Sequence, residues 1–205
     1  TYPLYEGFRH IMDPYWFGES FDGETPEAFG KRAARALEDE ILRCGPENVA
    51  AFAGEPVQGA GGVKIAPESY WPEIQRIIDK YGILFLADEV ITGFGRLGTW
   101  FASEYYGIRP NLITFAKAAT SGYIPLSGVI VDDMIVDVLM NHDDDFNHGY
   151  TFSGHPVACA VALANLDIME RERLVPRVKE TNGPRLARML AKFKDHPLVG
   201  EVRSV

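Results

Sequence analysis

The chain is poor in cysteine, in long apolar runs and in positive charge. Its 205 residues include only two cysteines, Cys44 and Cys159, too few for a disulfide framework and not spaced as metal ligands. No stretch approaches the ~20 apolar residues of a membrane span, and the first residues lack a signal-peptide pattern. A formal net charge of -9 argues against nucleic acid, which favours a basic face. We therefore expect a protein of the reducing cytoplasm, with neither a nucleic-acid nor a membrane partner.

Neither end of the chain looks like a natural boundary. Thr1 stands in place of an initiator methionine, and residues 199–205 resemble a strand that has just begun. We therefore expect a piece of a longer protein. With 46% hydrophobic residues, the chain can still build one sizeable core or a large part of a bigger one.

Apolar runs and helical periods alternate along most of the chain. Residues 1–24 show no sustained period, so we expect an irregular segment there. We expect strands at 49–53, 84–88, 111–116, 127–131 and 199–205, and helices at 25–44, 67–81, 134–140, 157–173 and 178–193. The alanine-rich face of the helix at 157–173 suits close packing on a sheet. A strand, a helix and a strand in this order imply a right-handed parallel crossover. The pattern predicts an α/β fold with a mostly parallel sheet.

The apolar run at 84–88 ends at two carboxylates, Asp88 and Glu89, before a glycine-punctuated turn. Such a run is typical of a strand buried on both faces of a parallel sheet. In these sheets, ligands gather beyond the carboxyl ends of the strands. Because side chains alternate along a strand, Asp88 and Val90 should face one side and Glu89 the other.

Two further strand-like runs end in side chains that can bind or react with a ligand. The first leads to Glu55 and Gln58, and the second leads to Lys117. Taken singly, Lys117 fits a solvated strand-end lysine and Asp88 an acid that caps a turn. At one sheet edge, however, a desolvated lysine amine can form a Schiff base with an aldehyde. A carboxylate such as Asp88 can keep a pyridine nitrogen protonated, and Val90 can pack flat on such a ring.

A polar loop at 141–156 carries three histidines and three consecutive aspartates. A metal-binding module based on His142, Asp143 and His148 is one interpretation. Consecutive aspartates more often form a solvated turn, and no histidine pair has the spacing of helical metal ligands. The prediction is that the chain binds no metal.

Four ordered motifs resemble the class III pyridoxal-phosphate-dependent aminotransferases of fold type I, and within them the ω-amino acid:pyruvate transaminases. The motifs occupy 54–59, 87–96, 116–123 and 148–156. The resemblance implies a three-layer α/β/α large domain. It assigns 25–195 to part of this cofactor-binding domain, packs 1–24 on it and starts a small C-terminal domain at 196–205.

The same resemblance implies a role for each matching residue around pyridoxal phosphate. Lys117 would form the Schiff base and move the proton between the substrate carbon and the cofactor. Asp88 would pair with the pyridinium nitrogen, and Val90 would pack on one face of the ring. Glu55 would lie in the shell around the ring and Asp88.

The remaining implied contacts concern the cofactor phosphate and ring hydroxyl. Tyr150 and Thr151 would reach across a dimer interface to the phosphate of the neighbouring subunit, although a turn hydroxyl bonding its own backbone is the simpler interpretation of Thr151. Many relatives that use glutamate as amino donor carry an acid at the position of Ala60. Its absence here resembles the ω-amino acid:pyruvate transaminases. Ile91 replaces a glutamine that bonds the ring hydroxyl, and Gln58 is a possible substitute.

The implied activity is transfer of an amino group from an ω-amino acid or amine to pyruvate or a similar keto acid, in a homodimer with shared active sites. Other class III reactions, an aminomutase or a decarboxylating transaminase, keep the same cofactor. A non-catalytic scaffold fragment is a further alternative. By the same resemblance, the phosphate-binding turn and the substrate arginine lie outside 1–205, so we expect the piece alone to be inactive.

Overall fold

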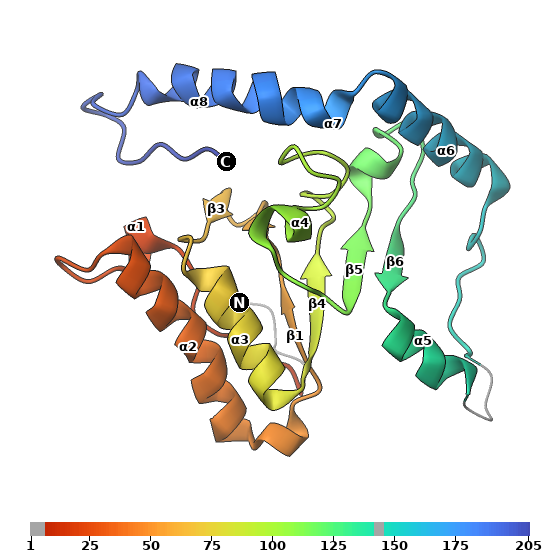
Figure 1. Ribbon diagram of the computed structural model, residues 1–205, viewed down its shortest axis with the longest axis horizontal. Coiled ribbons are helices and arrows are strands. Elements are labelled where there is room, and N and C mark those ends of the chain that lie inside the picture. The colour runs from red at the N-terminus through yellow and green to blue at the C-terminus, as the bar shows by residue number, and fades with distance from the viewer. Residues whose placement is uncertain (1–6, 142–145) are drawn as a thin grey trace.

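The computed structural model describes residues 7–141 and 146–205, and its centre is a four-stranded sheet (Figure 1). The strand order is β1 (Ala51–Gly54), β4 (Leu84–Asp88), β5 (Leu112–Phe115) and β6 (Gly128–Val131). β4 runs parallel to both β1 and β5, whereas β6 is antiparallel to β5. The predicted mostly parallel sheet is confirmed.

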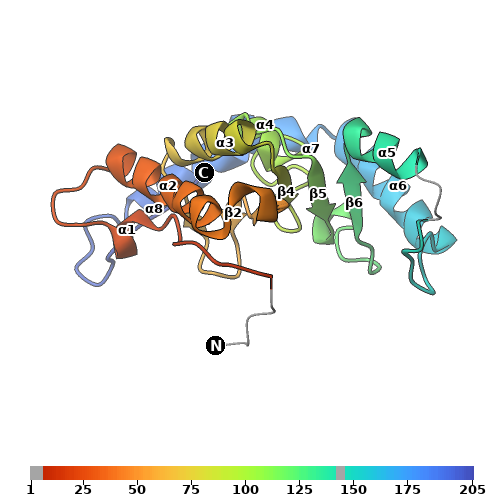
Figure 2. The same ribbon diagram turned by 90° about the horizontal axis from the view of Figure 1, so that it is seen from below.

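Two helices, α2 (Pro26–Cys44) and α3 (Tyr70–Tyr81), cover one face of this sheet (Figure 2). The Thr25 hydroxyl caps α2 by accepting a hydrogen bond from the Ala28 backbone N–H at 3.2 Å. Burial of each large apolar side chain here stabilises the fold by about 1.5–3 kcal/mol. The shared core includes Phe29, Leu37, Ile41, Phe52, Trp71, Ile74, Ile77, Phe85 and Ala87.

The opposite face of the sheet is less covered. Ala51 and Ala53 of β1 are exposed, and Leu84 and Leu86 of β4 are only half-buried, while the alternate positions are buried. The described residues therefore supply one helical layer of the three-layer arrangement expected from the sequence.

The remaining elements surround the sheet edge and the periphery. A hairpin joins β2 (Val57–Gln58) to β3 (Lys64–Ile65). The short helices are α1 (Trp16–Glu19), η1 (Pro46–Asn48), α4 (Ala102–Tyr106), η2 (Lys117–Ala119) and α5 (Asp133–Met140). A last helical run comprises α6 (Pro156–Arg171), α7 (Leu174–Arg177), the π-helical η3 (Val178–Asn182) and α8 (Gly183–Ala191). Within the described ranges, no helix is both long and apolar enough to cross a membrane.

Three regions differ from the sequence predictions. The glycine-rich turn after β1 contains the β2–β3 hairpin, which two-residue strands do not reveal. The expected packing of α6 on the sheet is wrong for most of its length, since only Ala158 and Met169 are buried. The predicted strand at 199–205 is also wrong. Instead, the Arg203 guanidinium donates hydrogen bonds to the carbonyl oxygens of Gly62 and Val63 at 2.7 and 3.0 Å.

Candidate active site

The turns that follow β1, β4 and β5 begin side by side at the carboxyl edge of the sheet. Gly54 is the register partner of Ala87, and Asp88 is the register partner of Thr114. Glu55 follows β1 directly, and Lys117 begins η2 just beyond β5. The structure thus brings Glu55, Asp88 and Lys117 to one edge of the sheet, as parallel pairing requires.

Asp88 is held by one of its two carboxylate oxygens. Its Oδ1 accepts hydrogen bonds from the Thr114 hydroxyl and the Val90 backbone N–H, both at 3.1 Å. Within the described ranges, Oδ2 accepts no hydrogen bond, so it is available to an external donor. β4 ends at Asp88 and Val90 lies in the following turn, so strand alternation does not extend to Val90.

The adjacent carboxylate, Glu89, is fully buried and accepts hydrogen bonds from the backbone instead. Its oxygens accept hydrogen bonds from the backbone N–H groups of Ala102 and Ser103 at 2.6 and 2.8 Å. The hydroxyls of Thr92 and Ser103 donate to the same carboxylate. Ala102 and Ser103 lie at the start of α4, where a negative charge is favoured, and Thr92 lies in the turn after β4. Glu89 therefore ties the turn after Asp88 to α4.

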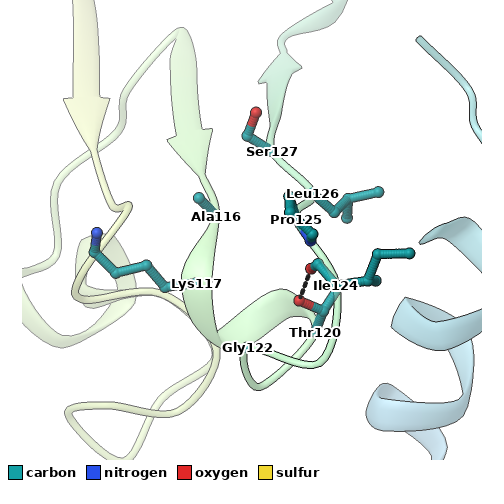
Figure 3. A pocket seen from close by; sticks show the side chains of 8 residues that line it. All are labelled: Ala116, Lys117, Thr120, Gly122, Ile124, Pro125, Leu126 and Ser127. Atoms are coloured by element: carbon teal, nitrogen blue, oxygen red, sulfur yellow. Dashed lines mark hydrogen bonds between the residues drawn. The ribbon is translucent and has the colours of Figure 1, made fainter. Parts of the chain in front are cut away.

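Lys117 is exposed and has a φ angle of +44°, which is unusual for a residue with a side chain. It lines a hollow of about 370 Å³ with Ala116, Thr120, Gly122 and residues 124–127 (Figure 3). In Figure 3 its side chain extends away from Ile124 and Leu126. The Lys117 ammonium forms no ion pair with another described residue, so the amine is open to a ligand.

The turns after β1 and β4 pack against each other at Gly59. The Glu55 carboxylate accepts a hydrogen bond from the Gly59 backbone N–H at 3.0 Å, which fixes the start of the hairpin. A Cβ atom on Gly59 would lie 2.1 Å from Cδ1 of Ile91. The absence of a side chain at Gly59 therefore allows the two turns to approach closely.

Gln58 contacts the N-terminal segment. Its amide donates a hydrogen bond to Oδ1 of Asp13 at 3.2 Å, and Lys64 forms an ion pair with Oδ2. The Lys64 hydrogen bond holds the pKa of the Asp13 carboxyl below its ordinary value. Gln58 thus has a protein partner for its amide N–H, while its role toward a cofactor hydroxyl stays a prediction.

Tyr150 and Thr151 do not line the hollow beside Lys117. Tyr150 is 77% exposed and lines a second hollow of about 500 Å³, which shares residues 124–127 with the hollow beside Lys117. Thr151 is exposed and lines neither hollow.

The metal interpretation rests largely on residues outside the described ranges. His142 and Asp143 fall outside them, whereas His148 is described and exposed. Among the described residues, no three histidine, cysteine or acidic side chains cluster as metal ligands.

Sequence reasoning missed two side chains that hold the site. Thr114 orients Asp88, and its only signal in the sequence is a hydroxyl residue within the apolar run 112–116. Asn165 of α6 donates hydrogen bonds to the carbonyl oxygens of Ala118 and Ala119 in η2. Its only signal was that it is the first amide or charged side chain along an otherwise apolar, alanine-rich stretch of the helix.

Comparison with known proteins gives consistent matches. The model of the family "Aminotransferase class-III" matches residues 18–205. A putrescine–pyruvate aminotransferase of Pseudomonas aeruginosa is 55% identical over 199 residues, covering 97% of this chain and 43% of that protein. A diaminobutyrate–2-oxoglutarate transaminase of Halomonas elongata is 49% identical over 205 residues, covering 98% and 44% respectively.

Solved structures agree with these sequence matches. An (S)-enantioselective ω-transaminase from Thermomicrobium roseum superposes with a TM-score of 0.92 at 51% identity, covering 98% of this chain and 45% of that one. An ω-transaminase from Pseudomonas jessenii in complex with PMP gives 0.91 at 44% identity, with coverage of 98% and 45%. The chain thus spans less than half the length of these relatives.

Proposed function

The chain belongs to the class III aminotransferases, and from this premise we propose that the whole protein transfers an amino group from an amine or ω-amino acid to pyruvate, using pyridoxal phosphate. One observation carries the proposal: an exposed Lys117 amine without an ion-pair partner among the described residues shares a sheet edge with Asp88. The putrescine–pyruvate relative and the ω-transaminase structures support this choice of substrates.

The side chains at this edge fit pyridoxal phosphate. When bound, the cofactor supplies an aldehyde and a ring that withdraws electrons from the amine-bearing carbon. Lys117 offers an amine for the aldehyde, and Oδ2 of Asp88 offers an acceptor for a protonated ring nitrogen. The Pseudomonas jessenii relative, solved with PMP, supports the same cofactor class.

In this proposal the protein residues hold the reactants and move one proton. Nζ of Lys117 accepts the proton from the amine-bearing carbon of the substrate and returns it at a neighbouring position. Thr114 holds Oδ1 of Asp88 through its hydroxyl, which leaves Oδ2 for the ring nitrogen. Val90 would pack on one face of the ring, and the Glu55 carboxylate holds the neighbouring hairpin turn by accepting a hydrogen bond from the Gly59 N–H.

We also propose a cytoplasmic homodimer in which Tyr150 and Thr151 serve the cofactor phosphate of the partner subunit. The exposure of both residues supports an intermolecular role. Cys44 and Cys159 are free, which suits a reducing compartment. Residues 25–195 would then belong to the large domain, with 1–24 packed on it and 196–205 leading to the small one.

Product analysis of the full-length protein tests the proposal. With pyridoxal phosphate, putrescine and pyruvate, we expect formation of alanine, with 2-oxoglutarate as the competing acceptor to compare. Lys117→Ala should lower the rate by about 10²–10⁴-fold because the proton carrier is lost. Lys192→Ala, which removes an exposed lysine of the C-terminal region, is the matched control. Absence of alanine in the wild type, or equal rates in the two variants, contradicts the proposal.

A further inference from the structure

The turn that contains Lys117 is hydrogen-bonded to Asn165 of α6, which lies outside the turn. The Asn165 amide donates hydrogen bonds to the carbonyl oxygens of Ala118 at 2.9 Å and Ala119 at 3.1 Å. Its carbonyl Oδ1 accepts a hydrogen bond from the Ser121 hydroxyl at 2.7 Å. Both ends of one amide thus bind a turn that lies more than forty residues earlier in the chain.

This turn needs support because its backbone is unusual. Lys117 and Ser121 have φ angles of +44° and +50°, in the left-handed region that side chains disfavour. Such conformations persist when surrounding contacts hold them. The turn has local bonds of its own, including the Thr120 hydroxyl to the Ile124 carbonyl oxygen at 2.7 Å (Figure 3). Local bonds, however, do not anchor the turn to the rest of the fold.

α6 packs against the rest of the fold near its own residue Asn165. Most of this helix is exposed, but Met169, one turn beyond Asn165, is buried. The Met169 side chain lies next to Gly95, in the turn that follows Asp88. The segment of α6 that bonds η2 therefore also contacts the turn beside the second site residue.

We propose that Asn165 is a positioning residue for Lys117, acting through the carbonyl oxygens of Ala118 and Ala119. This proposal rests on the proposed function, because it assigns Asn165 to the presentation of the Lys117 amine. Asn165 touches no reacting group and acts only through the backbone of η2. Only a side chain with an N–H donor and an oxygen acceptor can make all three bonds.

Two variants and one control separate positioning from general stability. Asn165→Leu keeps the approximate size and removes all three bonds. Asn165→Asp keeps the acceptor for Ser121 but removes the donors to the carbonyl oxygens. Asp167→Asn changes an exposed residue on the same helix and is the matched control. All are made in the full-length protein.

The first readout uses protein without cofactor. Hydrogen exchange of the peptide containing residues 117–121 should quicken by about tenfold in both Asn165 variants, because the turn opens more often. The Asp167→Asn protein should exchange at the wild-type rate. Unchanged exchange in both Asn165 variants overturns the proposal.

The second readout uses protein loaded with pyridoxal phosphate. We expect kcat to fall about 10- to 100-fold with KM for the amine within about threefold, since a displaced reacting group costs rate rather than binding. The pH midpoint of the visible absorbance band should also move by at least about half a unit. Wild-type kcat and midpoint in Asn165→Leu overturn the proposal, while a wild type that shows no band and no turnover overturns the proposed function instead.

Discussion

At the scale of single residues, Asp88 and Glu89 show how two adjacent carboxylates acquire different tasks. Glu89 has all its acceptor capacity directed at buried donors near α4. Asp88 has one oxygen engaged by Thr114 and Val90, and the other directed to no described donor. The difference lies in the donors supplied by neighbouring elements and not in the residues themselves. Only the less satisfied carboxylate can serve a ligand.

Thr114 offers the most direct test of this arrangement. In the full-length protein, Thr114→Val should lower kcat/KM about tenfold, because a hydrogen bond to a charged group contributes about 1.5–3 kcal/mol. Thr114→Ser keeps the hydroxyl and should restore most of the activity. Steady-state kinetics with one amine and pyruvate measure both effects. Wild-type activity in Thr114→Val together with a loss in Thr114→Ser would show that packing of the methyl group, and not the hydrogen bond to Asp88, matters.

At the scale of elements, the β2–β3 hairpin is held by segments from both ends of the described chain. Asp13 pairs with Lys64 from the N-terminal side, and Arg203 bonds Gly62 and Val63 from the C-terminal side. The hairpin turn also contacts the turn after β4 through Gly59. Its position at the site edge is therefore set by contacts far apart in the sequence.

The Asp13–Lys64 pair makes a pH-dependent prediction. The hydrogen bond from Lys64 lowers the pKa of Asp13 in the folded protein, so its contribution to stability is present above the unfolded pKa. That contribution is lost as the pH falls through the folded pKa. Asp13→Asn should therefore be less stable than wild type at pH 7, with a difference that shrinks below about pH 4. Thermal unfolding midpoints measured across this range test it, and a constant difference at all pH values would contradict it.

The turn at Gly98 packs against the helical run at the other side of the site. Gly98 has a φ angle of +83°, and an added Cβ would lie 2.8 Å from Cα of Lys179 in η3. Gly98→Ala should destabilise the protein by about 2–4 kcal/mol through combined backbone strain and overpacking.

Gly107→Ala is the matched control for Gly98→Ala. Its φ angle is +63°, and an added Cβ meets no atom within 4 Å. Gly107→Ala should lower the free energy of unfolding by only about 1–2 kcal/mol, because it adds backbone strain without overpacking. Denaturant unfolding of both variants separates strain from packing, and equal losses would show that the contact with η3 is unimportant.

At the scale of the whole molecule, the chain exposes more surface than an independent domain of its size. Its accessible surface is 13890 Å², against about 9,600 Å² expected for a folded monomer of the same mass. Large apolar side chains, including Tyr123, Tyr150 and Phe152, are more than three-quarters exposed. Such surfaces commonly contact further protein.

The proposed homodimer predicts that a substitution on this exposed apolar surface weakens subunit association or cofactor binding. Light scattering of the full-length protein should give twice the subunit mass at micromolar concentration. Tyr150→Asp should weaken the dimer or the cofactor binding, since it places a charge at the expected interface. Tyr105→Asp, on an exposed tyrosine of α4, is the control. A full-length monomer that is active would contradict shared active sites.

The accuracy of the sequence predictions follows from the range of the interactions involved. The strand at Leu84–Asp88 and the two helices predicted at 25–44 and 67–81 were predictable, because apolar runs and helical periods are local signals. The prediction of a strand at 199–205 was wrong, because a segment with strand propensity forms a strand only where a neighbouring strand pairs with it.

Long-range contacts at the site were beyond the sequence patterns. The Asn165 bonds to η2 and the Arg203 bonds to the hairpin join residues more than forty positions apart. The shared edge of Glu55, Asp88 and Lys117 was predictable only because parallel strands bring their carboxyl ends together. How Glu89 and Asp88 divide their hydrogen bonds depends on α4 and β5, so it required the folded structure.

Covalent capture at Lys117 tests the central claim most directly. The full-length protein is loaded with pyridoxal phosphate, reduced with borohydride and mapped by peptide mass spectrometry. We predict a single pyridoxyl group on the peptide that contains Lys117, and none in Lys117→Ala. A pyridoxyl group attached to another lysine, or no attachment in a protein that binds the cofactor, would contradict the assignment of Lys117 and the site built around it.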